Sequence, residues 1–306
     1  MGDLFAILTQ GGNSLAAHRA ASATASHNIQ NANTPGFARQ RAELTAVLPG
    51  DDIGKGQVGR GVSLLNITQA RDKFIEAQLP TALGNHAKSA AEAETLEAVT
   101  TLDPNAENGL AANLGKLYAT MRQLSQNPGD RGLRQAVIAA GQGLTLAFNQ
   151  ADASITTAKN GAEAKLVDVL GDANRAAANI ADLNRQIRQG SATSSPNDLI
   201  DARQKNMDRL AELTGAYAVS SGNNVISMML PGGTPLVSEF SSATLTAVGN
   251  STTGNLDVMV QPPGATMTKL VSGDHFSGSV GGLLEARDQG LDAARNELNQ
   301  LAFDFT

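Results

Sequence analysis

Apolar residues at helical spacing dominate the chain between residues 110 and 187. In the first and third of three successive segments the larger apolar residues recur three or four positions apart, and in the second they recur four or seven apart, which is the spacing of helices that pack side by side. We expect one helix for each segment, with a turn at 127–130, and the last two helices each about 40 Å long. The segments carry Leu110, Leu114, Leu117, Met121 and Leu124, then Leu133, Val137, Leu144, Phe148 and Ile155, then Leu166, Val169, Ala173, Ala176, Ile180, Leu183 and Ile187.

Helical spacing continues after residue 187 and is interrupted by one β-prone region. A further helix is expected over 197–215, with Gly215 as its C-cap, so residues 69–215 are predicted to form an α-helical bundle. Short β-prone runs separated by Gly, Asn and Pro then indicate a small β-rich domain over 216–280. Helical spacing returns over 281–306 and still continues at Phe305, so we expect a helix that rejoins the bundle and is truncated.

The N-terminal segment, residues 1–68, has a different character. Residues 3–30 read as a weakly amphipathic helix, and Thr34-Pro35-Gly36 should end it, with Pro-Gly at the centre of a type II turn. Two extended segments are expected at 37–48 and 61–68. The fold class is therefore mainly α: a long-helix bundle with an inserted small β-rich domain, and an N-terminal helix plus extended arm. Because large apolar residues are few over 1–68, this segment is predicted to order only within an assembly.

Composition excludes several function classes. The chain has no cysteine, which excludes disulfides, thiolate metal sites and cysteine nucleophiles. Its net charge of −6 argues against nucleic-acid binding, which requires a basic face. No run is apolar enough to span a membrane, and the first twelve residues do not resemble a cleavable signal.

No motif supports a catalytic, cofactor or metal site. Gly54, Gly56 and Gly59 match a dinucleotide-binding string, but the following residues read as a strand where a helix is required. Asp103, Asn105 and Glu107 have calcium-loop spacing without the required glycine and final glutamate, so we interpret them as a polar loop. The four histidines form no metal pair, and there is no G-x-S-x-G sequence. We therefore expect a protein that is not an enzyme.

One motif is specific. The run HNIQNANTPGFARQ at 27–40 resembles the N-terminal signature N-I-x-N-x-x-T-P-G-[YF] of the axial proteins of the bacterial flagellum. Arg39-Gln40 after the aromatic residue points within that group to the FlgK family of hook-associated proteins. Further blocks resemble that family in the same order, at 59–79, 127–138, 180–187, 196–214, 232–237 and 281–302.

The chain departs from that family in two places. Pro80 interrupts a helix that the family usually runs continuously, so we expect a kink or break near Leu79. FlgK proteins are also longer, and finish with a C-terminal helix that pairs with the N-terminal one. Without that partner we expect the helix at 3–30 to be unsupported.

The resemblance implies a structural role at the junction between the flagellar hook and its filament, where the first helix lines an inner wall and packs against copies of itself. Side-chain amides would satisfy neighbouring subunits without burying charge, and Pro35-Gly36 would set the direction of the chain. The implied assembly interface consists of Leu4, Leu8, Leu15, Asn28, Ile29, Asn31, Asn33, Thr34, Pro35, Gly36 and Phe37.

The resemblance also implies partners and a location. The partners are identical subunits in a ring, the hook protein, the second junction hook-associated protein, and an export chaperone whose usual site lies in the missing C-terminal part. Neither nucleic acid nor membrane is among them. The protein would be secreted through the flagellar type III apparatus without a cleaved signal. The alternatives are another axial protein, of hook or rod type, and a hydrolase carried in the β-rich domain.

Overall fold

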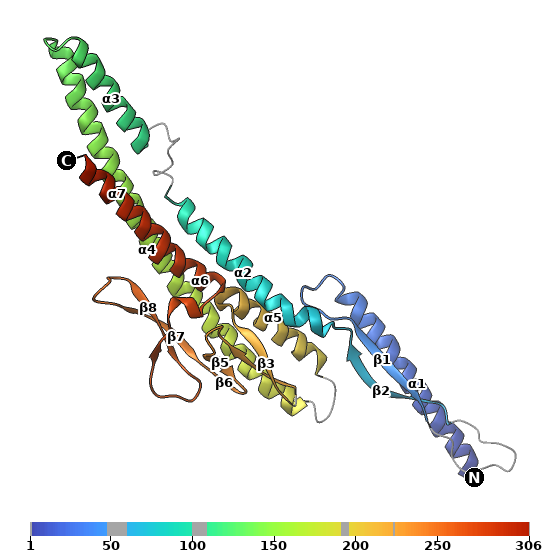
Figure 1. Ribbon diagram of the computed structural model, residues 1–306. Coiled ribbons are helices and arrows are strands. Elements are labelled where there is room, and N and C mark those ends of the chain that lie inside the picture. The colour runs from blue at the N-terminus through green and yellow to red at the C-terminus, as the bar shows by residue number, and fades with distance from the viewer. Residues whose placement is uncertain (1, 48–59, 100–108, 191–195, 223, 306) are drawn as a thin grey trace.

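The structure is a computed structural model that describes residues 2–47, 60–99, 109–190, 196–222 and 224–305. It is a long rod (Figure 1). One end is an N-terminal arm, which we define as residues 2–47 and 60–71. The other end is a helical hairpin, and the remaining helices and small sheets form the body between them. This confirms the predicted fold class, mainly α with a long-helix bundle and small β sheets inserted between helices.

The longest element is α4 (Arg131–Gly190), one helix of 60 residues that is about 90 Å long. The prediction of two separate helices in this region was wrong. Between the two predicted stripes the buried face continues through Ala158 and Ala162. The segment contains no proline, and Gly161 alone costs about 1 kcal/mol relative to alanine, which is too little to end a helix packed along its length.

Helix α3 (Leu110–Gln126) packs antiparallel to the start of α4 and forms the end of the rod opposite the arm (Figure 1). As predicted, the two are joined by a turn at 127–130. The carboxylate of Asp130 caps α4 by accepting from the backbone N–H groups of Gly132 and Leu133. The predicted stripes meet at the interface, where Leu117, Ala140 and Leu144 are buried.

Helix α2 (Lys73–Glu97) passes through Pro80 without interruption. The predicted break near Leu79 was therefore wrong. A proline removes one backbone donor from a helix interior, but Pro80 is buried and α2 is held by tertiary packing. Along α2, Gly282 of the neighbouring helix comes so close that an added Cβ would lie 2.2 Å from the carbonyl oxygen of Lys88. This contact requires glycine.

The centre of the body is a bundle of α2, α4, α5 (Asn197–Thr214), α6 (Gly278–Glu285) and α7 (Asp292–Asp304), with a π-helical segment at Ala286–Leu291 before α7. Gly215 ends α5 in the left-handed conformation, with φ of 73°, as predicted. The fully buried side chains at the centre of this bundle are Leu166, Leu170, Ile180, Leu210, Leu213 and Leu283.

The inserted β-rich region contains two small antiparallel sheets that lie against α4. One has the order β3-β4-β5-β6 and the other β7-β8-β9. All of their strands except β6 overlap the predicted β-prone runs. The strands span Tyr217–Gly222, Val225–Met229, Pro235–Ser238, Ser241–Ser242, Thr244–Gly249, Leu256–Gln261 and Lys269–Leu270.

Asparagines of α4 attach these strands to the bundle. The amide of Asn174 donates to the carbonyl of Leu245 at 2.8 Å and accepts from its N–H at 2.7 Å. Asn184 donates to the carbonyls of Ile226 and Glu239 and accepts from the guanidinium of Arg203. Burial, together with repulsion from Arg71, lowers the pKa of Arg203 to about 10.

The arm consists of α1 (Gly2–Gln30) and a hairpin of β1 (Gln40–Ala46) and β2 (Val62–Gln69). The two predicted extended segments are thus paired, antiparallel, from Gln40 opposite Gln69 to Ala46 opposite Val62. The hairpin lies along α1 (Figure 1). The expectation that α1 is unsupported was therefore wrong for the face that the hairpin covers.

Candidate assembly surface on the N-terminal arm

An exposed apolar stripe runs along α1. Leu4, Leu8, Leu15 and Ile29, all predicted interface residues, are 65%, 62%, 61% and 77% exposed. Their spacings of four, seven and fourteen place them on one side of the helix, in the register of a heptad repeat. Large apolar side chains left in solvent on one helix face mark a surface that binds another chain segment.

The opposite face of α1 carries small residues and packs on the hairpin. Ala17 is 2% exposed and Thr24 is 6% exposed. The hydroxyl of Ser14 accepts from the backbone N–H of Val62 in β2, at 3.2 Å. Because small side chains let the strands approach closely, the hairpin is held with little apolar area. The large residues of α1 are left for a different contact.

The asparagines at and just after the end of α1 fasten its C-terminal end to the rest of the arm. Asn28 Nδ2 donates to the carbonyl oxygen of Gln40 at 2.7 Å, and the N–H of Gln40 donates to Asn28 Oδ1 at 2.8 Å. Asn31 Nδ2 donates to the carbonyl of His27 at 3.0 Å, and Thr34 donates to Asn31 Oδ1 at 3.3 Å. Asn28 and Asn31 are therefore hydrogen-bonded within their own chain, whereas the exposed side chain of Asn33 makes no hydrogen bond to the described residues.

The turn at 34–37 matches the prediction. The N–H of Phe37 donates to the carbonyl of Thr34 at 3.2 Å, and Gly36 has φ of 82°, as the third position of a type II turn requires. Pro35 and Gly36 are exposed, and Phe37 packs edge-on against the ring of His27 with centroids 5.3 Å apart. This turn faces the body across a hollow of about 360 Å³, lined also by Asp198, Asp201 and Lys205 of α5.

The joint between arm and body is built on the first two turns of α5. The carboxylate of Asp201 accepts from the backbone N–H of Ala38 at 3.1 Å and from the side chain of Gln69 at 2.8 Å. It also pairs with Arg71, which in turn pairs with Glu76 at 2.5 Å. Asn197 adds a bond to the carbonyl of Ile67 at 2.9 Å. The arm is thus fixed at its base, while α1 extends beyond the body.

Electrostatics stabilise this joint. Burial lowers the pKa of Arg71, but hydrogen bonds and charge attraction from Glu76 and Asp201 outweigh burial and raise it. At the exposed edge, His27 Nε2 lies 3.3 Å from Asp198 Oδ1, and Gln40 donates to the same oxygen at 2.9 Å. Arg71, Glu76, Asp198 and Asp201 therefore each have a partner of opposite charge or matching polarity.

The sequence does not indicate the body side of this joint. Asn197, Asp198 and Asp201 lie in 196–214, a stretch whose pattern predicts only a helix and resembles a family block. Their spacing places Asn197 and Asp201 on one side of α5. Nothing in the sequence pairs them with residues 38 and 69, which are more than 120 positions away.

The described residues hold no group of three or more His, Asp or Glu side chains arranged to bind a metal ion. Within the same residues, no helix is both long enough and apolar enough to cross a bilayer. The glycine string at 54–59 and the acidic loop at 103–107 lie outside the described residues.

The profile of the flagellar hook-associated protein FlgK helical domain matches residues 96–306. Flagellar hook-associated protein 1 of Salmonella typhimurium is 28% identical over 299 residues, covering 95% of this chain and 53% of that protein. The protein of the same name from Bacillus subtilis is 29% identical over 226 residues, covering 70% of this chain and 44% of its own length. The chain thus spans about half the length of these relatives.

A solved structure from the same family has a similar fold. The flagellar hook junction protein FlgK from Burkholderia pseudomallei superposes with a TM-score of 0.64 and 25% sequence identity. The match covers 76% of this chain and 42% of that one.

Proposed function

The chain belongs to the FlgK family of flagellar hook-associated proteins, and on that premise we propose that it is a structural subunit of the junction between the flagellar hook and filament. Its mechanism is packing between subunits, through the arm. The match to the FlgK helical domain favours this role over that of a hook or rod protein.

One observation carries the proposal: the stripe of Leu4, Leu8, Leu15 and Ile29 stays in solvent although the base of the arm is fixed to the body. Burial of one such side chain contributes about 1.5–3 kcal/mol. Four at heptad spacing supply enough to drive helix association. The hairpin of β1 and β2 already occupies the other face of α1. The stripe therefore remains available to bind a helix of a neighbouring subunit.

The partners follow from the position of such a subunit. We expect identical subunits in a ring to contact one another through their arms, with the hook protein on one side and the second junction hook-associated protein on the other. Export would proceed through the flagellar type III apparatus without a cleaved signal. No catalytic step is required, so the protein acts without being an enzyme.

The test replaces two residues of the stripe. Leu8→Asp with Leu15→Asp places two charges on it without touching the hairpin face or the joint. The variant gene is expressed in the source bacterium after deletion of its own copy, and hooks with attached filaments are counted by electron microscopy. We expect the unchanged gene to restore filaments and the variant to restore almost none.

A matched control separates assembly from folding. Val167→Asp introduces a charge at another exposed apolar residue, in the middle of α4. It should restore filaments, and both variants should keep the circular dichroism of the unchanged protein. Normal filament numbers with the Leu8 and Leu15 variant would remove the basis of the proposal.

A further inference from the structure

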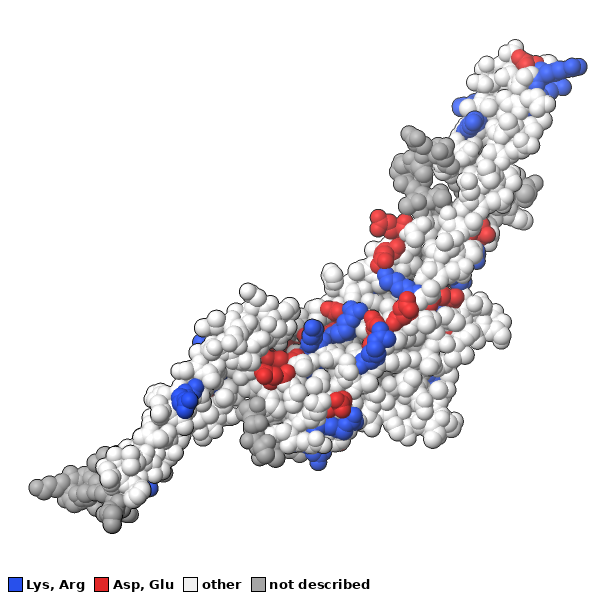
Figure 2. Space-filling view, turned by 180° about the vertical axis from the view of Figure 1, so that it is seen from behind, with Lys and Arg blue, Asp and Glu red and all other residues white. Residues whose placement is uncertain are grey.

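The hairpin end of the rod carries a charge opposite to that of the rest. We define the tip hairpin as residues 110–151, which contain α3 and the first part of α4. It has four basic residues and one acidic residue, a net charge of +3, which leaves −9 for the rest of a chain whose net charge is −6. In Figure 2 the tip carries mainly basic side chains, whereas both signs are mixed over the middle of the rod.

The basic side chains of the tip hairpin form no ion pair with any described residue of the chain. Lys116, Arg122 and Arg131 are exposed and have no ion pair among the described residues. Arg134 donates to the carbonyl of Pro128, at 2.7 Å, which fixes its position but leaves its charge unbalanced. In the body, by contrast, most basic side chains are paired, as in Lys88–Glu285, Lys159–Asp292 and Arg295–Asp152.

Apolar side chains accompany these charges. Two helices cannot enclose a full core, and Tyr118, Met121, Ile138 and Leu146 of the tip hairpin stay largely exposed. An exposed surface that combines unpaired arginines with methionine and tyrosine has the composition of a protein-binding surface. The charge of this surface calls for an acidic partner.

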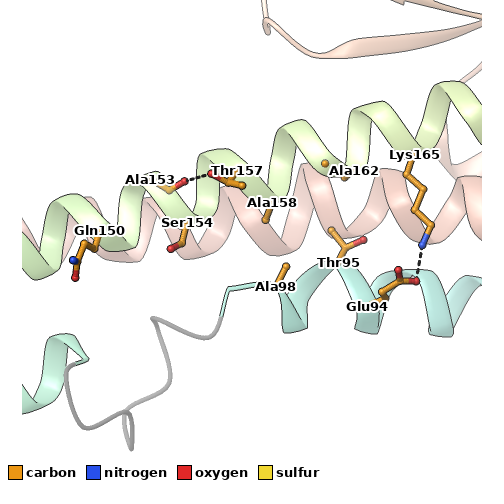
Figure 3. Close-up of a pocket in the computed structure, with 11 residues that line it drawn as sticks. Glu94, Thr95, Ala98, Gln150, Ala153, Ser154, Thr157, Ala158, Ala162 and Lys165 are labelled. Carbon is orange, nitrogen blue, oxygen red and sulfur yellow. Dashed lines mark hydrogen bonds and ion pairs between the residues drawn. The ribbon is translucent and has the colours of Figure 1, made fainter.

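A second copy of the chain offers such a surface at the end of α2. Glu92, Glu94 and Glu97 lie in its last two turns, and neither Glu92 nor Glu97 has an ion pair among the described residues. Beside them is a groove of about 760 Å³ between α2 and α4. Figure 3 shows its walls of small side chains, among them Ala98, Ser154 and Ala158, and the Lys165–Glu94 ion pair of 2.5 Å at one end.

We propose that the tip hairpin of one copy docks on the acidic end of α2 in a second copy, with its arginines on Glu92 and Glu97 and its apolar side chains in the groove. This proposal rests on the proposed function, because it specifies one contact between assembled subunits. The two surfaces differ, so the contact joins copies head to tail and builds a ring or a helical array. It is electrostatic at its rim and weakens as salt is added.

The absence of cysteine makes a direct test possible. Gln123→Cys places a thiol on the tip hairpin, and Ala93→Cys places one between Glu92 and Glu94; both positions are exposed. Equal amounts of the two proteins are mixed and oxidised at about 20 mM ionic strength. We expect a disulfide-linked heterodimer, and a much lower yield at about 500 mM, where the Debye length has fallen to about 4 Å.

Charge reversal identifies the contact. Arg122→Glu with Arg131→Glu in the tip protein should lower the heterodimer yield about fivefold or more. Arg175→Glu with Arg185→Glu changes the net charge equally, but on the body, and should leave the yield unchanged. Glu92→Arg with Glu97→Arg in the α2 protein should restore the yield with the reversed tip.

Three results would overturn the proposal. They are an unchanged yield with the reversed tip, an equal yield of tip-to-tip dimers from Gln123→Cys alone, and an equal yield with a cysteine at exposed Ser251, in the turn between β7 and β8. Filament counts with the reversed-tip gene separate the two proposals. Normal filaments without the cross-link would reject the head-to-tail contact and leave the junction role intact.

Discussion

The side-chain amide of Asn28 pairs with both backbone groups of Gln40, donating to its carbonyl at 2.7 Å and accepting from its N–H at 2.8 Å. Asn174 holds Leu245 in the same way. In each pair the side-chain amide of a helical asparagine makes the two hydrogen bonds that an adjacent strand would make to one residue at the edge of a sheet. Asparagine is used here to join helices to strands within the chain.

Replacement of Asn28 by alanine should loosen the arm without unfolding the body. The backbone groups of Gln40 would lose their partner, at a cost of about 1–3 kcal/mol. Hydrogen exchange of the Gln40 amide should accelerate accordingly, while amides in α4 keep their protection. Asn33→Ala, at an exposed residue without such a bond, is the control. Equal acceleration in both variants would contradict the role given to Asn28.

Asp201→Asn should release the arm from α5. It removes the charge that pairs with Arg71 and lies in the half-buried joint, so we expect a loss of about 3 kcal/mol in the stability of this contact. The measurement is the rate of proteolysis between residues 60 and 72. Asp198→Asn, at the exposed edge of the same joint, should change that rate little.

The effect of Asp201→Asn should not vary over the neutral pH range. Since the folded-state pKa of Arg71 is raised, its stabilising contribution is complete below the unfolded-state pKa and is lost only at strongly alkaline pH, above the folded-state value. A loss of the effect between about pH 6 and pH 9 would show that another group controls the joint.

Asp208 and Asp182 should show opposite pH dependence. Burial, and to a lesser extent repulsion from Glu212 and Glu76, raises the pKa of Asp208. Its charge therefore destabilises the fold at neutral pH, and the penalty disappears as pH falls through the folded-state pKa. Asp208→Asn keeps the acceptor for Gln204 and should raise the urea midpoint at pH 7 but have little effect at low pH.

The control variant, Asp182→Asn, should shift the urea midpoint in the opposite direction. Hydrogen bonds from Gln186 and Arg185 lower the pKa of Asp182. Its contribution is present above the unfolded-state pKa and is lost as pH falls through the folded-state value, so Asp182→Asn should lower the urea midpoint at pH 7. Shifts of the same sign in the two variants would refute this assignment.

Two glycine-to-alanine replacements should change the free energy of unfolding in opposite directions. Gly282→Ala would place a methyl group 2.2 Å from the carbonyl oxygen of Lys88, and we expect a loss of about 1–3 kcal/mol as α6 and α2 separate. Gly161→Ala has no neighbouring atom within 4 Å and should gain about 0.5–1 kcal/mol from helix propensity. Chemical denaturation followed by circular dichroism at 222 nm measures both. A loss in both variants would mean that α4 cannot accept a side chain at 161.

Spacing of apolar residues predicted most of the body, because helix burial repeats locally along the sequence. The same reasoning divided α4 in two, since between Ile155 and Leu166 the buried face is carried only by Ala158 and Ala162, with no larger apolar residue to continue the stripe. The predicted break near Leu79 gave too much weight to the helix-breaking effect of Pro80, which is offset in α2 by tertiary packing that the sequence alone does not show.

The candidate assembly surface was predictable only in part. Leu4, Leu8, Leu15 and Ile29 were identified by type and position, and they lie exposed on α1. Their role between subunits stays a prediction. The joint was not predictable, because the partners of Asp201 are fixed by how the arm meets the bundle and not by any local pattern.

The continuity of α4 has a mechanical consequence. One helix of 60 residues reaches from the tip hairpin to the neighbourhood of α5, and it contains no hinge, proline or change of direction that would absorb a bend. A rotation imposed where the arm is anchored must therefore appear at the far end as a lateral displacement, magnified by the length of the lever. A change in orientation of a subunit bound at one end of α4 would therefore shift the position of a subunit bound at the other end.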